Sequence, residues 1–165
     1  MPQPSVQIQY RRLLPGEVAL LRQLNLLFSR AFDDPASYES KPATDAYLMD
    51  FLAKDHVSVF VAVNDGRVLG GLVAYALDKF EMARREYYIY DLAVDAGHRR
   101  RGIATALIRH LCEFAADNAG WVVYVQADRG DEAAIALYNK LGMKEHVLHF
   151  DIQVPLQQRA DDIDA

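Results

Sequence analysis

The feature that most constrains the fold of this chain is a tyrosine-rich apolar segment that leads through a basic turn into an amphipathic helix. Residues Glu86–Val94 are typical of a strand, and residues Gly102–Asn118 repeat apolar side chains at helical spacing. The turn between them carries three consecutive arginines, Arg99, Arg100 and Arg101. A strand that passes so abruptly into a helix predicts an α/β architecture rather than an all-helical or all-β one.

The same turn has the chemistry of an anion site. Backbone N–H groups in the first turn of a helix have no partner within the helix and carry the positive end of its dipole. The residues that would present these groups are Gly102, Ile103, Ala104 and Thr105. Gly102 and Ala104 are small enough to let a phosphate approach the amides, so the turn is predicted to hold a pyrophosphate. The alternative is an ordinary strand-to-helix turn with solvated arginines.

The remaining elements follow from the same two periodicities. The order of strand, two helices, three strands, helix, strand, helix and strand predicts an α/β fold with a mixed sheet. The strands are expected at Val6–Leu13, Val57–Val63, Val68–Leu77, Glu86–Val94, Trp121–Ala127 (buried) and His146–Val154. The helices are expected at Gly16–Phe32, Thr44–Leu52, Gly102–Asn118 and Glu132–Leu141, and Asp33-Asp34-Pro35 ends the first.

Length and composition predict one domain. A chain of 165 residues with 52% apolar and 25% charged residues is long enough for a single core, expected over about 6–154, with 155–165 as a polar tail. No apolar run approaches the ~20 residues of a membrane-spanning helix, and the first residues lack a secretory signal. The expectation is a cytoplasmic enzyme without a membrane partner.

Charge and cysteine content exclude other classes. A net charge of −5 argues against a nucleic-acid partner and suits a cationic substrate, although it is also ordinary for solubility. The single cysteine, Cys112, excludes an internal disulfide and is expected to be a buried structural thiol. The five histidines show no metal-ligand spacing, so no metal is expected.

Two motifs resemble those of GCN5-related N-acetyltransferases. The spacing Arg99-x-x-Gly102-x-Ala104 is similar to the acetyl-CoA signature of that superfamily, and Ala136–Met143 resembles its second marker, a helix tyrosine followed by Leu-Gly. The segments Tyr88–Val94, Tyr124–Asp128 and His149–Ile152 further resemble type I aminoglycoside 3-N-acetyltransferases. The finer resemblance extends over most of residues 70–152.

The resemblance implies a fold and an activity. The fold would be a mixed, mostly antiparallel sheet with splayed central strands and flanking helices. The reaction would transfer acetyl from acetyl-CoA to the 3-amino group of the deoxystreptamine ring of an aminoglycoside by direct attack, which confers resistance. A homodimer is also implied. Alternatives are an N-acetyltransferase for another polyamine or a protein amino terminus, and a non-catalytic acyl-CoA-binding module.

The resemblance also assigns the cofactor contacts and the general acid. Leu92, Ala93 and Val94 would offer backbone groups to the pantetheine and the thioester, although their side chains fit an ordinary central strand equally well. Tyr138 lies at the motif position whose hydroxyl approaches the sulfur, so it is the candidate general acid. The alternative is a helix tyrosine packed on the sheet.

A carboxylate, directly or through water, must take a proton from the acceptor amine. Asp91 is the first candidate, because an aspartate in an apolar central strand is costly unless it has a partner, and Glu86 is the second. Strict alternation places Glu86 with Tyr88 and Asp91 on the opposite face with Tyr87, but the family has a bulge in this strand that would disturb the parity. Asp91 could instead be a structural acid bonded to a nearby loop.

An aminoglycoside carries several ammonium groups, so its site should be lined with carboxylates. The candidate substrate-binding residues are Asp128, Asp131, Glu132, Asp151, Glu81 and Tyr38. Asp131 and Glu132 could equally be the N-cap and first-turn acid of the next helix, and each acid alone could be a solvated surface residue. The loop reads Arg129-Gly130-Asp131 where many superfamily members have asparagine, so that cofactor contact does not transfer.

Overall fold

The computed structural model describes residues 7–155, which belong to two compact units, Met1–Asp128 and Arg129–Ala165. The first unit contains the sheet and four helices, and the second contains one helix among its described residues. The single domain expected over 1–165 stays a prediction. Val6, the expected start of the first strand, and residues 156–165 of the expected polar tail lie outside the described residues.

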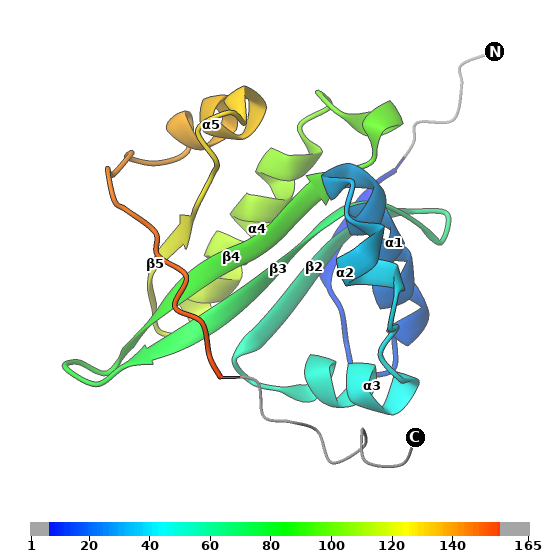
Figure 1. Cartoon of the computed structure of the whole chain (residues 1–165), viewed down its shortest axis with the longest axis horizontal. Coiled ribbons are helices and arrows are strands. Elements are labelled where there is room, and N and C mark those ends of the chain that lie inside the picture. The colour runs from blue at the N-terminus through cyan, green and yellow to red at the C-terminus, as the bar shows by residue number, and fades with distance from the viewer. Residues whose placement is uncertain (1–6, 156–165) are drawn as a thin grey trace. The chain divides into compact units, whose positions relative to one another are not determined.

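The first unit is built on a five-stranded sheet (Figure 1). From β1 to β4 each strand pairs with the next in antiparallel orientation, and β5 pairs with β4 in parallel orientation. The strands are, in sheet order, β1 (Gln9–Arg12), β2 (Val57–Asn64), β3 (Arg67–Lys79), β4 (Arg84–Val94) and β5 (Gly120–Val125). The predicted mixed, mostly antiparallel sheet is therefore confirmed.

Helices cover both faces of this sheet (Figure 1). One face carries α1 (Val18–Phe32), α2 (Pro35–Glu39) and α3 (Asp45–Ala53), and the other carries α4 (Ile103–Asp117). A short 3₁₀ turn, η1 (Ala96–His98), joins β4 to α4. The second unit contains α5 (Glu132–Asn139).

Each face has its own apolar packing. On the α4 face, the ring of Phe114 lies 5.8 Å from that of Phe60 and 6.2 Å from that of Tyr87, both edge to face. On the other face a buried cluster joins α1 and α3 to the strands, and its members are Leu13, Leu21, Leu24, Leu27, Phe28, Leu52, Val57, Val59, Val61, Val63, Val68, Val73 and Ala93. The helical spacing of apolar residues in Gly102–Asn118 is confirmed as the inner stripe of α4, which consists of Ile103, Leu107, Leu111 and Phe114.

The helix α2 was not expected from the sequence. The Asp33-Asp34-Pro35 segment ends α1 as predicted, because Asp33 adopts the left-handed conformation at the C-cap with φ of 53°. Asp34 and Pro35 then start a new helix, since the Asp34 carboxylate accepts a hydrogen bond from the Ser37 amide and proline occupies the first position. The same residues that stop one helix therefore begin the next.

Three sequence predictions are wrong. The segment His146–Val154 is not a strand, because alternation of apolar residues is only half of the requirement and no backbone ladder forms along it. The strand β5 is not buried: it lies at the edge of the described sheet, and Trp121 is 66% exposed beneath the Arg84 guanidinium. Cys112 is exposed, since it lies about 100° around α4 from the buried Leu111.

None of the helices within residues 7–155 has both the length and the apolar character that crossing a membrane requires.

Close packing of α1 on β3 generates a first testable prediction. A β-carbon at Gly71 would lie 2.8 Å from the carbonyl oxygen of Phe60 and 2.6 Å from Cδ1 of Leu24. We expect Gly71→Ala to lower the free energy of unfolding by about 1–3 kcal/mol, measured by urea denaturation, because the backbone atom cannot move aside easily. Gly16→Ala is the control, since a β-carbon there meets no atom within 4 Å. Equal effects of the two substitutions would contradict this packing.

Candidate active site

A β-bulge in β4 decides which way its acid points. In the ladder between β3 and β4, Val73 is opposite Asp91 and Ala74 is opposite Ile89, so Tyr90 is the extra residue. Because Tyr75 is opposite Tyr88, the bulge brings Asp91 to the face that carries Tyr88. Strict alternation, which places Asp91 with Tyr87 and Ile89, is therefore wrong, and the bulge that the family resemblance implies is confirmed.

Asp91 is half-buried on this face and has a hydrogen-bond donor. The hydroxyl of Tyr38, from α2, donates to Oδ1 of Asp91 at 2.9 Å. Burial raises the pKa of the Asp91 carboxyl above its ordinary value, and the bond from Tyr38 opposes this shift. A carboxylate with an elevated pKa is a better proton acceptor than a solvated one, so Asp91 is chemically suited to the role of a base.

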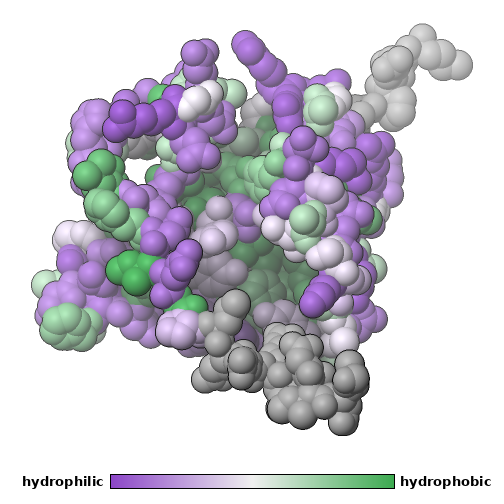
Figure 2. Space-filling model, viewed as in Figure 1, coloured by the Kyte–Doolittle hydropathy of each residue, from purple (hydrophilic) through white to green (hydrophobic). Residues whose placement is uncertain are grey.

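Asp91 faces a pocket of about 520 Å³. Apolar side chains dominate its wall, with several tyrosines and a few charged groups among them. Figure 2 shows hydrophilic surface over the helices α1–α3 and apolar surface over the sheet beside them. The lining residues come from α1, α2, α3, β3, β4 and the loop before α3: Leu21, Arg22, Leu24, Asn25, Leu26, Phe28, Ser37, Tyr38, Glu39, Lys41, Pro42, Ala43, Tyr47, Leu48, Phe51, Val73, Tyr75 and Asp91.

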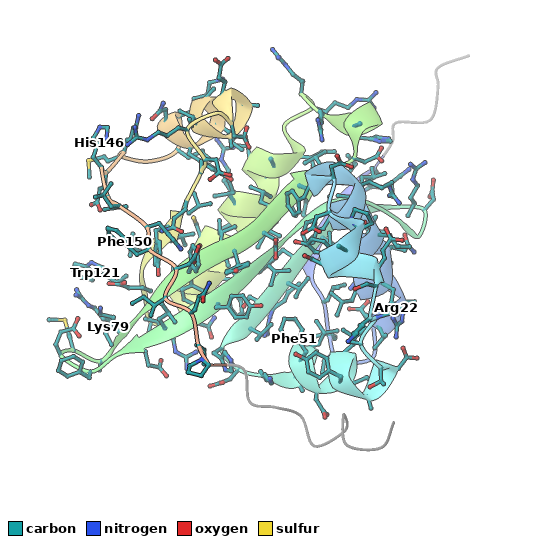
Figure 3. All side chains as sticks on the ribbon, viewed as in Figure 1. Arg22, Phe51, Lys79, Trp121, His146 and Phe150 are labelled. Atoms are coloured by element: carbon teal, nitrogen blue, oxygen red, sulfur yellow. The ribbon has the colours of Figure 1, made fainter. Side chains whose placement is uncertain are left out.

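Charged groups at the pocket wall are partly neutralised. Arg22 of α1, labelled with Phe51 of α3 in Figure 3, donates Nε to Asp45 at 3.0 Å and an Nη to the Ala43 carbonyl at 2.9 Å. These bonds connect α1 to the start of α3. Two carboxylates, Glu39 and Asp91, remain among the lining residues.

Contacts with α1 position the short helix α2. The side-chain amide of Asn25 donates to the carbonyl of Tyr38 at 2.7 Å. The hydroxyl of Ser29, which is 2% exposed, donates to the carboxylate of Glu39. Since α2 has only five residues, these two bonds contribute strongly to the position of the Tyr38 backbone.

A cluster of tyrosine rings lies next to Asp91. The ring of Tyr90 is 6.0 Å from that of Tyr75 and 5.7 Å from that of Tyr88, and Tyr88 stacks on Tyr124 at 4.9 Å. Sequence reasoning missed Tyr75 and Tyr47 as site residues. No local signal pointed to Tyr75, because the turn at Asn64–Arg67 joins β3 to β2 and the place of Tyr75 depends on the separate pairing of β3 with β4.

The basic turn between β4 and α4 has the backbone shape of an anion site. Gly102 has φ of 79° and Arg100 has φ of 62°, so both lie in the left-handed region. Arg99 Nε donates to the carbonyl of Val94 at 3.2 Å. Within residues 7–155 the amides of the first turn of α4, Ile103, Ala104 and Thr105, have no acceptor. Arg100 and Arg101 are exposed beside them.

The base of this turn is held by Asp95. Its carboxylate lies 2.8 Å from Nδ1 of His98 and 3.7 Å from an Nη of Arg67. The bond to His98 is the main reason why the pKa of Asp95 is below its ordinary value.

The strands β4 and β5 pair along only part of their length. Their parallel ladder ends at Ile89 and Val125, whereas β4 continues to Val94. Leu92, Ala93 and Val94 pair with β3 on one side, and their other edge has no strand partner among the described residues. These three are therefore ladder residues that also present an open backbone edge beyond the bulge.

Two predicted acids are engaged at the far end of the β3–β4 hairpin. Glu86, the second candidate base, forms an ion pair with Lys79 (labelled in Figure 3) at 3.7 Å, and Glu81 lies 3.2 Å from Arg84 and 3.8 Å from Lys79. Neither acid lines the pocket. The structure therefore does not bring Glu86 and Glu81 together with Asp91.

The second unit contains Tyr138 and three of the predicted acids. Tyr138 is half-buried, and burial is the main cause that raises the pKa of its hydroxyl, followed by the charge of Asp131. Asp131 is the N-cap of α5, because its carboxylate accepts from the Ala134 amide at 3.0 Å, and Glu132 lies in the first turn. The alternative interpretation of these two as helix-start residues is thus confirmed. Asp151 lies 3.0 Å from Nε2 of His149. Asp128, the last residue of the first unit, is exposed.

The chain is similar to known proteins over most of its length. A family model described as the acetyltransferase (GNAT) family matches residues 21–143. The structure of an aminoglycoside acetyltransferase from an uncultured soil metagenomic sample is 48% identical, with a TM-score of 0.88, and the match covers 90% of this chain and 99% of that one. A second such enzyme, in complex with sisomicin, is 29% identical, with a TM-score of 0.83 over 90% of this chain and 97% of its own.

Curated relatives are more distant. N-acetyltransferase 8 from Homo sapiens is 28% identical over 120 residues, which is 64% of this chain and 53% of that protein. A probable N-acetyltransferase, family 8 member 5, from Mus musculus is 27% identical over 139 residues, covering 82% of this chain and 59% of that protein. The chain thus spans little more than half the length of these two relatives.

The Asp95 contact yields a prediction of pH dependence. A carboxyl whose pKa is lowered on folding adds stability above its unfolded pKa, and this contribution disappears as the pH falls through the folded pKa. We expect Asp95→Asn to lower the free energy of unfolding at pH 7 by about 0.5 kcal/mol, and the difference to vanish in acid. The measurement is urea denaturation of both proteins from pH 7 to pH 3. Asp50→Asn, in an exposed part of α3, is the control. A difference that persisted in acid would refute the assignment.

Proposed function

The chain belongs to the acetyltransferase (GNAT) family, and we propose that it transfers the acetyl group of acetyl-CoA to an amine of an aminoglycoside. Support comes from two aminoglycoside acetyltransferases of the same fold, one at 48% identity and one in complex with sisomicin. The resemblance of Tyr88–Val94, Tyr124–Asp128 and His149–Ile152 to type I enzymes favours the 3-amino group of the deoxystreptamine ring. Acetylation there would remove a charge from the drug and confer resistance.

The residues of the basic turn fit the coenzyme. The unpaired amides of Ile103, Ala104 and Thr105 and the exposed Arg100 and Arg101 would hold its pyrophosphate. Gly102, with φ of 79°, lets the chain turn into the helix without a side chain that blocks the anion. Arg99, bonded to the Val94 carbonyl, would shape the loop as well as add charge.

The open backbone edge of β4 fits the pantetheine arm. Its amides and carbonyls at Leu92, Ala93 and Val94 would bind that arm as an added strand. Acetyl-CoA supplies an activated thioester. A preorganised backbone donor at its carbonyl is typically worth on the order of 3 kcal/mol in the transition state.

The observation that carries the proposal is the bulge at Tyr90. It turns the half-buried Asp91 carboxylate into a pocket of about 520 Å³, on the strand whose open edge begins at the same point. In the proposed reaction, Asp91 takes the proton of the acceptor amine as the new C–N bond forms. The C–S bond breaks, and Tyr138 gives a proton to the departing sulfur. Glu86, paired with Lys79, is the weaker candidate for the base.

Carboxylates would recognise the other ammonium groups of the substrate. We propose Asp128, Asp131, Glu132, Asp151 and Glu81 for this role, with Tyr38 at the pocket wall. All five acids are exposed, so a cationic sugar could approach them. A homodimer, as in the type I resemblance, belongs to the same proposal.

A second acceptor class has an observation in its favour. The pocket wall is mostly apolar and includes Arg22 and Lys41 beside Glu39 and Asp91. Such a wall also suits the amino terminus of a peptide or another polyamine with an apolar part.

The test is release of free thiol from acetyl-CoA by the purified protein with three separate acceptors. We expect release with gentamicin and none with an analogue whose 3-amine is blocked. Release with spermine alone would keep the acetyltransferase and refute the aminoglycoside assignment. Silence with all three, while acetyl-CoA still binds in calorimetry, would favour a peptide acceptor or a non-catalytic module.

The roles of Asp91 and Tyr138 are tested by removing their proton chemistry. We expect Asp91→Asn and Tyr138→Phe each to reduce kcat by about 10²–10⁴-fold, because both changes keep the shape and remove the proton acceptor or donor. Affinity for acetyl-CoA, measured by calorimetry, should stay within about twofold of the unmodified protein. Asp50→Asn on α3 is the control. Full activity of Asp91→Asn would transfer the role of base to Glu86 or to water.

A further inference from the structure

One hydrogen bond joins the candidate base to a helix far away in the sequence. Tyr38 and Asp91 are 53 residues apart, and the Tyr38 hydroxyl donates to Oδ1 of Asp91 at 2.9 Å. The backbone of Tyr38 is held at its carbonyl by Asn25, and the next residue, Glu39, accepts from the buried Ser29. The donor is thus fixed at its backbone as well as at its hydroxyl.

We propose that Tyr38 is a positioning residue for Asp91, which holds one carboxylate oxygen so that the other faces the acceptor amine in ionised form. This inference rests on the proposed function, since it takes Asp91 as the base. It changes the role expected for Tyr38, which the sequence places among the substrate contacts. The substrate class stays the same as in the proposed function: an amine that must lose a proton before it attacks.

The surroundings of Asp91 make the hydrogen bond from Tyr38 important for the charge state of the carboxylate. Its neighbours from the strands are Val73 and Tyr75 of β3 and Tyr88 and Tyr90 of β4. None of these side chains donates a hydrogen bond to the Asp91 carboxylate within the described chain. Burial in this apolar and aromatic setting favours the protonated acid, and the Tyr38 hydroxyl favours the charged form.

Charged groups of the helices and of the loop before α3 are also near the pocket. Lys41 and Glu39 line its wall from the segment after Tyr38, and Asp34, at the start of α2, adds negative charge near the Tyr38 hydroxyl. Arg22 of α1 lines the same wall but bonds Asp45 and a backbone carbonyl. The burial of Tyr38, then its bond to Asp91, raises the pKa of its hydroxyl, which therefore stays a donor at neutral pH.

A purely structural role is the alternative. The Tyr38 ring packs against Phe28 at 6.2 Å and Phe32 at 5.9 Å, so it also attaches α2 to α1. Tyr38→Phe separates the two roles, because it keeps the ring contacts and removes only the hydroxyl. Tyr10→Phe is the matched control: it removes the hydroxyl of a half-buried tyrosine that stacks on His110 of α4 and does not line the pocket.

The first readout is the pH profile of kcat/KM from pH 5 to pH 9. Asp91 must be ionised to act, so loss of the donor should move the acid limb to higher pH. We expect Tyr38→Phe to reduce kcat/KM about tenfold on that limb and less than about twofold on the high-pH plateau. The acid limb of Tyr10→Phe should coincide with that of the unmodified protein. A uniform loss at every pH in Tyr38→Phe would overturn the proposal.

The second readout is coupling. If Tyr38 acts through Asp91, adding Tyr38→Phe to Asp91→Asn should cost no further activity, whereas independent roles would multiply the two losses. Multiplied losses would overturn the proposal in favour of direct substrate contact.

The third readout needs no turnover and therefore separates the two proposals. The Asp91 carboxyl can be titrated by NMR of protein carrying ¹³C-labelled aspartate, assigned with Asp91→Asn. We expect its midpoint to lie at higher pH in Tyr38→Phe than in the unmodified protein and in Tyr10→Phe. The same shift in a protein that acetylates no acceptor would refute only the proposed function. An unshifted midpoint in an active protein would refute only the role of Tyr38.

Discussion

The candidate site depends on one physical constraint, the unfavourable free energy of burying the Asp91 carboxylate. A charged group that leaves water loses several kcal/mol of hydration unless a partner replaces it. Asp91 is half-buried among apolar and aromatic side chains, and its replacement partner is the hydroxyl of Tyr38. That partner comes from a five-residue helix whose position depends on two bonds from α1. The sheet, α1 and α2 are thus linked through a single ionisable group.

The parts of the fold that depend on local pattern were predictable. The inner stripe of α4, the hairpin at Asn64–Arg67 and the basic turn before Gly102 each rest on residues close together in sequence. Their physics is local: helical periodicity, a turn with positive φ, and first-turn amides without partners. For the same reason the sharp backbone turn at Gly102 follows from the residues of the turn itself.

The parts that depend on distant partners were not predictable. Alternation in His146–Val154 satisfies the side-chain half of a strand, but a strand also requires a neighbour, which no periodicity encodes. Tyr75 and Tyr47 reach the pocket only because β3 and α3 pack beside α1. The helix α2 could not be predicted, because the Asp34-Pro35 sequence is equally typical of the end of one helix and of the beginning of the next. The ion pairs that Glu81 and Glu86 form with Arg84 and Lys79 at the hairpin end also depend on the fold, and no sequence pattern indicates them.

The bulge in β4 makes insertions and deletions in this strand more disruptive than substitutions. The extra residue, Tyr90, decides which face of the sheet each later side chain of β4 points to, because side chains along a strand alternate between the two faces. Substitutions along β4 leave this alternation unchanged. Deletion or insertion of one residue there would place the Asp91 carboxylate on the α4 side of the sheet. Substitutions in the pocket wall are therefore compatible with this strand, whereas an insertion or a deletion in β4 would change the face on which Asp91 lies.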